Sequence, residues 1–250
     1  MLTSIAATFA PELSTGAFYA LVVVSYFASL ITVALGIGGG AIMLTVMASL
    51  MPPLALIPVH GAVQLGSNVT RAAVFLRHVQ WSALGGFAIG TLAGIALGGS
   101  VAVSLSPGLV QVGVGLFVIW SVLAKPPKWL SRLPWLTGGI SSFLTMFFGA
   151  TGTFVAAFTK SLMLPKEQHV GTHAALMTMQ HGLKVVMFAV LGVAFGPWLL
   201  LIGALLASGF LGTLTGRLVL GRIPDAMFKR ALDAVLVLVS LRLIWVGLTG

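Results

Sequence analysis

Long apolar stretches follow one another along almost the whole chain, separated by glycine, proline or a few polar residues. In the first half they cover 17–35, 41–57, 60–76, 81–103 and 107–123, and in the second half 135–148, 154–164, 169–192, 197–219 and 227–248. A helix needs about 20 apolar residues to cross a bilayer, and the third, fourth and fifth stretches of each half approach or reach that length. The pattern predicts an all-α polytopic integral membrane protein with about 8–10 membrane helices.

Two of the stretches, 135–148 and 154–164, are too short to cross a bilayer alone without tilt or local thinning. A glycine-containing break separates them. We therefore expect two short helices that form either a re-entrant pair or two short spans.

The two halves of the chain match each other at a constant offset of 113 residues, since His60, Asn68, Arg71 and Phe75 fall opposite His173, His181, Lys184 and Phe188. The glycine-rich runs 36–40 and 149–153 fall in the same register. We expect one membrane transport domain over 1–250, built from repeat 1 (17–123), a basic cytoplasmic linker (124–134) and repeat 2 (135–248). A duplicated hydrophobic unit with a broken helix and an intramembrane cation in each copy is typical of a transporter.

The basic residues orient the repeats, because loops rich in Lys and Arg stay in the cytoplasm. Arg77 follows the third stretch of repeat 1, and Lys125, Lys128 and Arg132 lie in the linker. In repeat 2 the cations instead precede the third stretch and follow the fourth, while the segment 193–197 carries none. The two repeats are therefore predicted to have inverted topologies, with both termini outside.

The composition agrees with the membrane interpretation. The chain is 58% hydrophobic and 7% charged, whereas soluble domains carry roughly 25% charged residues. The net charge of +9 is spread along the chain, so it does not indicate nucleic-acid binding. There is no cysteine, which excludes disulfides, thiolate metal sites and cysteine nucleophiles. No cofactor is expected.

Each repeat carries a polar stripe along one face of its third helix. The candidate substrate-binding residues are His60, Gln64, Asn68 and Arg71 in repeat 1 and His173, Gln180, His181 and Lys184 in repeat 2. An Arg or Lys in mid-membrane costs about 2.5–3.5 kcal/mol on insertion scales, so it usually faces a cavity or a partner. The chain has only four carboxylates, so an external anion is the natural partner. Snorkelling to the interface is the alternative for Arg71.

The glycine runs form the second element of the predicted site. The helix-break motifs are Gly36, Gly38, Gly39 and Gly40 in repeat 1 and Gly149, Gly152 and Thr153 in repeat 2. The half-helices that follow would direct their N-terminal N–H groups and positive dipole ends toward an anion. Close packing of helices through small residues is the alternative interpretation, and it is preferred for Gly85, Gly86, Gly90, Gly94, Gly98 and Gly99.

Other classes of function fit fewer residues. His169 and His173 are one helical turn apart, but no cysteine or nearby carboxylate joins them, so no metal site is expected. Ser67 could pair with a histidine in an intramembrane hydrolase, yet no nucleophile elbow or orienting carboxylate supports catalysis. An assembly subunit would explain the hydrophobicity but not two polar stripes in register. We expect no enzyme activity.

At these residues the chain resembles the sulfite exporter TauE/SafE family of membrane anion permeases. The resemblance depends on the run Leu35–Gly40, the break Gly149–Thr153 and the segment Gly171–His173, and it covers about 17–248. The second break departs from the first, because it reads Gly-Ala-Thr-Gly-Thr.

The resemblance implies an inner-membrane permease for sulfite, an organosulfonate or a related sulfur oxyanion. A small-carboxylate permease and an anion channel fit the same residues. With both termini outside, the termini would lie in the periplasm. The expected partners are a small anion and the lipid bilayer, while a homodimer and coupling to protons or sodium are left open. Alternating access would move one repeat against the other around the site.

Overall fold

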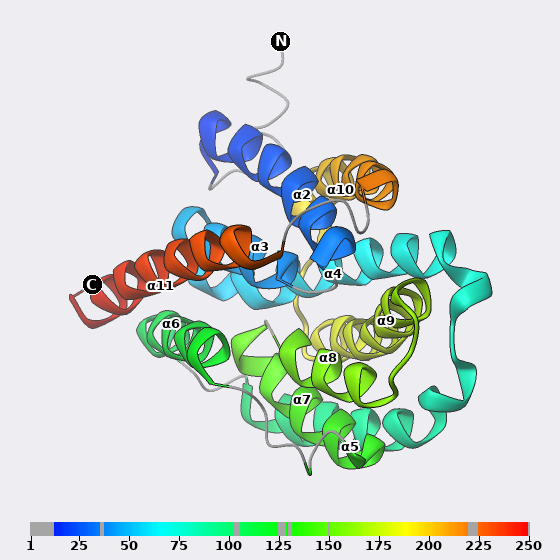
Figure 1. The fold of residues 1–250 in the computed structure, drawn as a ribbon. Helices are drawn as coiled ribbons and strands as arrows, with labels where there is room; N and C mark the ends of the chain where they lie inside the picture. The colour runs from blue at the N-terminus through cyan, green and yellow to red at the C-terminus, as the bar shows by residue number, and fades with distance from the viewer. Residues whose placement is uncertain are drawn as a thin grey trace.

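The protein is a bundle of helices (Figure 1). The computed structural model describes residues 13–35, 38–102, 106–124, 129, 132–149, 151–219 and 225–249. The first half of the chain contains α2 (Thr15–Leu35), α3 (Gly39–Leu50), α4 (Pro53–Val74), α5 (Leu84–Ala102) and α6 (Pro107–Leu123). The second half contains α7 (Pro134–Phe148), α8 (Gly152–Ser161), α9 (Lys166–Val190), α10 (Leu199–Val219) and α11 (Asp225–Thr249). The described residues contain no strand, so the all-α prediction is confirmed.

Three segments are long and apolar enough to cross a membrane by length and composition: 15–34, 81–101 and 196–218. They contain α2, α5 and α10. The helices α4 and α9 are also long enough, with 22 and 25 residues, but their polar stripes lower their hydropathy. Polar residues in such helices are expected to face the interior of the bundle.

The boundary between α3 and α4 differs from the predicted one. The hydropathy pattern continues from 41 to 57, yet α3 ends at Leu50 and α4 starts at Pro53. Proline fits the first turn of a helix, where no N–H is needed, and it stops a preceding helix. Pro52 and Pro53 therefore fix this junction. As a result His60 lies a full two turns inside α4 rather than at its start.

Helices from the first half of the chain pack mainly against helices from the second half. Helix α5 packs along α7, and α10 packs along α2 (Figure 1). The central pair α4 and α9 and the lateral pair α6 and α11 each join one helix from either half. The starts of α3 and α8 (39 and 152) and of α4 and α9 (53 and 166) are both 113 residues apart. Helices equivalent at this offset thus make equivalent pairings.

Glycine permits the close approach of these helix pairs. A Cβ atom at Gly90 would collide with the carbonyl oxygen of Trp135, and one at Gly94 with that of Gly139, both on α7. On the other side, a Cβ at Gly212 would meet the carbonyl oxygen of Tyr26 on α2. The packing interpretation is confirmed for Gly90 and Gly94. Gly85, by contrast, has open space around it.

Both predicted helix breaks are present. Gly38 precedes α3 with a φ of 113°, and Gly149 ends α7 with a φ of 75°. L-residues rarely adopt such backbone angles, so glycine is required at both positions. Gly39 packs directly on the carbonyl of Ala28 and the hydroxyl of Thr32 in α2. Gly36 lies outside the described residues.

Candidate functional site

A cavity of about 60 Å³ lies where the two helix breaks meet α4 and α9. A cavity needs about 10–15 Å³ to hold one water molecule, so this one has room for several waters or a small ligand. Its walls come from both halves of the chain: Thr32, Gly38, Gly40, Ala41, His60, Gln64, Asn68, Arg71, Gly149, Gly152, Thr153, His173, Met177 and His181. Six of the eight predicted substrate-binding residues therefore line one cavity.

Arg71 is the cation of this cavity. Its side chain is only 3% exposed, and its guanidinium donates to Asn68 Oδ1 at 2.8 Å and to Ser67 Oγ at 3.1 Å. Its Nε atom is buried without a hydrogen-bond partner. Of the four carboxylates only Glu167 has a described side chain, and that side chain is exposed. Arg71 is thus buried inside the bundle and held by neutral groups, instead of snorkelling.

Two histidines join the long helices to the half-helices. His60 Nε2 lies 3.1 Å from the carbonyl oxygen of Gly40, in the first turn of α3. His173 Nε2 lies 3.3 Å from the carbonyl oxygen of Gly152, in the first turn of α8. Because a carbonyl oxygen only accepts, each Nε2 donates. The rings of His60 and His181 meet edge to face, with centroids 6.2 Å apart.

Unpartnered polar atoms concentrate around the cavity. Nine buried side-chain nitrogen or oxygen atoms lack a hydrogen-bond partner within the described residues. Four of them belong to cavity residues, namely Nδ1 of His60, Nδ1 of His181, Nε of Arg71 and Oγ1 of Thr153. The three nitrogen atoms among the nine unpartnered atoms all belong to cavity residues. Buried polar groups are normally paired, so each such group calls for an explanation such as a ligand.

The other two predicted substrate-binding residues, Gln180 and Lys184, lie behind the cavity wall. The Lys184 ammonium donates to the carbonyl oxygen of Thr145 at 2.8 Å and lies 5.9 Å from the centre of the Phe188 ring. Its aliphatic stem packs on Gly61, where a Cβ would lie 3.1 Å from Lys184 Cε. Gln180 donates to Thr151 Oγ1 at 2.7 Å and so holds the α7–α8 break. Neither side chain lines the cavity.

A comparison with known families matches residues 21–243 to the sulfite exporter TauE/SafE family. The chain belongs to this family. A search of curated proteins and a search of solved structures found no match. The family match runs from α2 to α11 and includes every residue of the cavity, so the resemblance carried by the glycine runs is confirmed. TauE/SafE proteins are membrane anion exporters, which makes this chain an integral membrane protein of a transporter family.

Two threonines, one in the cavity wall and one behind it, were missed by sequence reasoning. Thr32 lines the cavity and accepts a hydrogen bond from the Gly39 N–H at 3.1 Å. Thr145 provides the carbonyl that holds Lys184. These two threonines are 113 residues apart, so the repeat offset could have identified them as a pair. Met177, which the helical spacing places on the same face as His173 and His181, also lines the cavity and adds an apolar contact.

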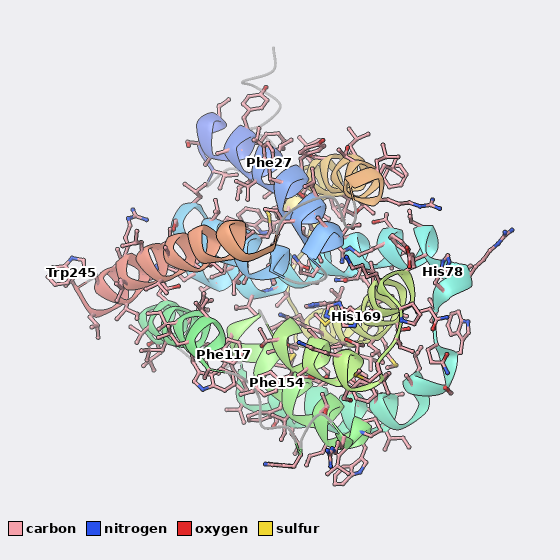
Figure 2. The ribbon with its side chains drawn as sticks, in the orientation of Figure 1. Phe27, His78, Phe117, Phe154, His169 and Trp245 are labelled. Atoms are coloured by element: carbon pink, nitrogen blue, oxygen red, sulfur yellow. The ribbon has the colours of Figure 1, made fainter. Side chains whose placement is uncertain are left out.

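His169 and His78 lie away from the cavity lining. Figure 2 shows His78 at the outer edge of the bundle and His169 beside α8, closer to the interior. The His169 and His173 rings stack with centroids 6.4 Å apart. Among the residues that the structure describes, no group of three His, Cys, Asp or Glu gathers at one point.

Proposed function

We propose that this TauE/SafE protein is a secondary transporter for a small anion, namely sulfite, an organosulfonate or a related sulfur oxyanion, which binds in the cavity between α4 and α9. The observation that supports this most directly is Arg71. It is a buried guanidinium with a free Nε and no described carboxylate partner. Such a cation in a membrane protein favours an anion from solution as its counter-charge.

The groups around Arg71 would complete the binding site. Asn68 and Gln64 offer amide groups from the same face of α4, and His173 and His181 face them from α9. The first turns of α3 and α8 border the cavity at Gly40 and Thr153. The N-terminal turn of a helix carries a partial positive charge, which would favour an anion in the cavity.

Lys184 and Gln180 would act from behind this wall. The Lys184 ammonium adds positive potential and holds α9 against the end of α7, while Gln180 fixes the α7–α8 break. A displacement of α9 would therefore change the break and the cavity together. This linkage suits alternating access, in which the inverted repeats move against each other and expose the cavity to each side in turn.

A small-carboxylate permease and an anion channel use the same kind of site. A carboxylate is also a small anion with oxygen acceptors, so Arg71 and the amides would bind it too. A channel would conduct without saturation or exchange. Exchange measurements with different anions distinguish a carboxylate permease and a channel from a transporter of sulfur oxyanions.

The decisive experiment uses purified protein in liposomes. Vesicles preloaded with unlabelled sulfite are diluted into a trace of radiolabelled sulfite, and accumulation of label inside is followed. A transporter exchanges labelled for unlabelled sulfite and accumulates the label transiently, whereas a channel lets the preload leak out. Preloading with methanesulfonate or acetate in separate samples distinguishes sulfonates from carboxylates. Absence of exchange with all three anions would refute the proposal.

A further inference from the structure

The two ring nitrogens of His60 have different environments. Nε2 lies 3.1 Å from the Gly40 carbonyl oxygen and must carry a hydrogen, because the oxygen has none to give. Nδ1 is buried and unpartnered. It faces the second break, since a Cβ added to Gly149 would lie 3.2 Å from it. His60 and Gly149 both line the cavity, so Nδ1 lies in the cavity wall beside the second break.

The fixed hydrogen on Nε2 determines what Nδ1 can bind. A neutral imidazole has one N–H only, so with Nε2 protonated Nδ1 presents a lone pair. The oxygen atoms of an anion also present lone pairs, and two acceptors repel each other. An anion that has no hydrogen to donate can bind Nδ1 directly only when Nδ1 also carries a proton, so that the ring is an imidazolium.

His181 is not restricted in this way. Its Nδ1 is also unpartnered, but no hydrogen bond within the described residues fixes a hydrogen on its Nε2. The ring can change tautomer and donate from Nδ1 without taking up a proton. His173 is held by Gly152 as His60 is held by Gly40, but its Nδ1 is not among the buried unpartnered atoms. The requirement for an added proton therefore falls on His60.

We infer that His60 takes up one proton at Nδ1 when the anion binds, so that the protein carries a proton together with its anionic substrate. The inference depends on the proposed anion site and adds the coupling ion to it. The bond formed is Nδ1–H, the proton comes from solution, and the proton returns to solution when the anion leaves. No oxidation or reduction is involved.

The surroundings of His60 make the proton and the anion depend on each other. His181 and Lys184 on α9 lie beside it, and Arg71 and His173 share its cavity. The cavity residues from α2, α3, α7 and α8 carry no titratable side chain. With only basic groups near, an added proton is repelled while the cavity lacks a negative charge. A bound anion removes that repulsion, and by linkage the proton strengthens the binding of the anion equally.

The test is isothermal titration calorimetry of the purified full-length protein with sulfite and, separately, methanesulfonate, in buffers of different ionisation enthalpy. Methanesulfonate stays unprotonated, so any proton taken up with it must enter the protein. We expect uptake approaching one proton per anion at neutral and higher pH, with affinity falling up to about tenfold per pH unit. The variant His60→Gln keeps an N–H for the Gly40 carbonyl but cannot titrate, and it should bind more weakly without proton uptake.

The control is His78→Gln, at the outer edge of the bundle (Figure 2), which should behave like the wild type. Melting temperatures measured without anion show whether each variant is folded. Anion binding to the wild type without proton uptake would overturn the inference and leave the proposed function intact. Undiminished uptake in His60→Gln would also overturn it. Failure of both anions to bind the wild type would refute the proposed function itself.

Discussion

The ammonium of Lys184 donates a hydrogen bond to the backbone carbonyl of Thr145 over 2.8 Å. Thr145 lies in the last turn of α7, and its carbonyl also accepts from the Gly149 N–H at 3.2 Å. The last carbonyls of a helix carry partial negative charge and attract cations. Lys184 thereby attaches the middle of α9 to the end of α7 that forms the second helix break.

Replacing Lys184 by methionine should lower transport without lowering stability. Burying an isolated charge costs several kcal/mol, whereas a hydrogen bond from a charged group returns only about 1.5–3 kcal/mol. Methionine retains most of the apolar packing on Gly61 and Phe188. We expect an equal or higher melting temperature and at least a tenfold slower sulfite exchange per folded protein, about 1.4 kcal/mol at the barrier.

The matched control for this change is Lys160→Met, because Lys160 is exposed at the end of α8. It should leave exchange unchanged. A lower melting temperature with normal exchange in Lys184→Met would instead assign Lys184 a purely structural role.

Arg71→Gln tests the cation of the cavity. The glutamine retains hydrogen-bonding groups for Asn68 but removes the charge. A hydrogen bond to a charged group contributes about 1.5–3 kcal/mol, so sulfite affinity should fall roughly 10- to 150-fold. Titration calorimetry measures this loss. The control is Arg77→Gln, on the exposed turn after α4, which should bind sulfite like the wild type. Equal sulfite affinity in the two variants would contradict the assignment of Arg71 to the anion site.

Gly149→Ala should damage the second break. The φ of 75° is unfavourable for alanine, and the new Cβ would lie 3.0 Å from Leu44 Cδ1 and 3.2 Å from His60 Nδ1. We expect a loss of about 1–3 kcal/mol of stability and weaker anion binding. Gly203→Ala, in α10 with open space around it, should leave both quantities unchanged or slightly raise stability. The comparison uses thermal melts with and without sulfite.

Gly94→Ala should disturb the contact between α5 and α7. Its Cβ would collide with the carbonyl of Gly139, so the two helices must move apart. Overpacking of this kind typically costs about 1–3 kcal/mol, which lowers the melting temperature. Gly85→Ala, in the same helix but in open space, is the control. Similar melting temperatures for the two variants would argue against close packing at this helix pair.

The absence of native cysteine makes a direct test of the inverted topology straightforward. Single cysteines at Ser82, exposed in the short 3₁₀ turn before α5, and at Ala194, exposed between α9 and α10, are treated in intact cells with a membrane-impermeant thiol reagent. The distribution of Lys and Arg predicts labelling at Ala194→Cys from outside and at Ser82→Cys only after the membrane is permeabilised. Labelling of both from the same side would refute the inverted arrangement.

The sequence was sufficient to predict the order of the helices and the positions of the breaks. Hydropathy located ten helical stretches, and glycine located the interruptions, because both signals are local. The spacing along α4 also placed His60, Gln64, Asn68 and Arg71 on one cavity wall. The 3.6-residue period fixes which residues share a face, and that face was correctly expected to be interior.

The partners of each side chain could not be predicted in the same way. Lys184 is equivalent to Arg71 in sequence, yet it lies behind the cavity wall, where the end of α7 offers its ammonium the carbonyl of Thr145. The period of a helix does not say which neighbouring helix supplies a partner. The α3–α4 boundary was missed for a different reason, since hydropathy does not register where Pro52 and Pro53 begin a new helix.

The packing of α2 against α10, which is far away in the sequence, has a consequence for biogenesis. Ser25 in α2 donates to the carbonyl of Leu205 in α10 across 180 residues of sequence, and Ser208 donates back to Val22 at 2.6 Å. Helix α2 thus meets α10 only when nearly the whole chain has been synthesised. Until then Ser25 lacks its partner on α10, although Ser29 can already pair with Ser67 of α4. A chain that ends before α10 would lack this packing partner for α2, and we expect it to be a substrate for membrane quality-control proteases.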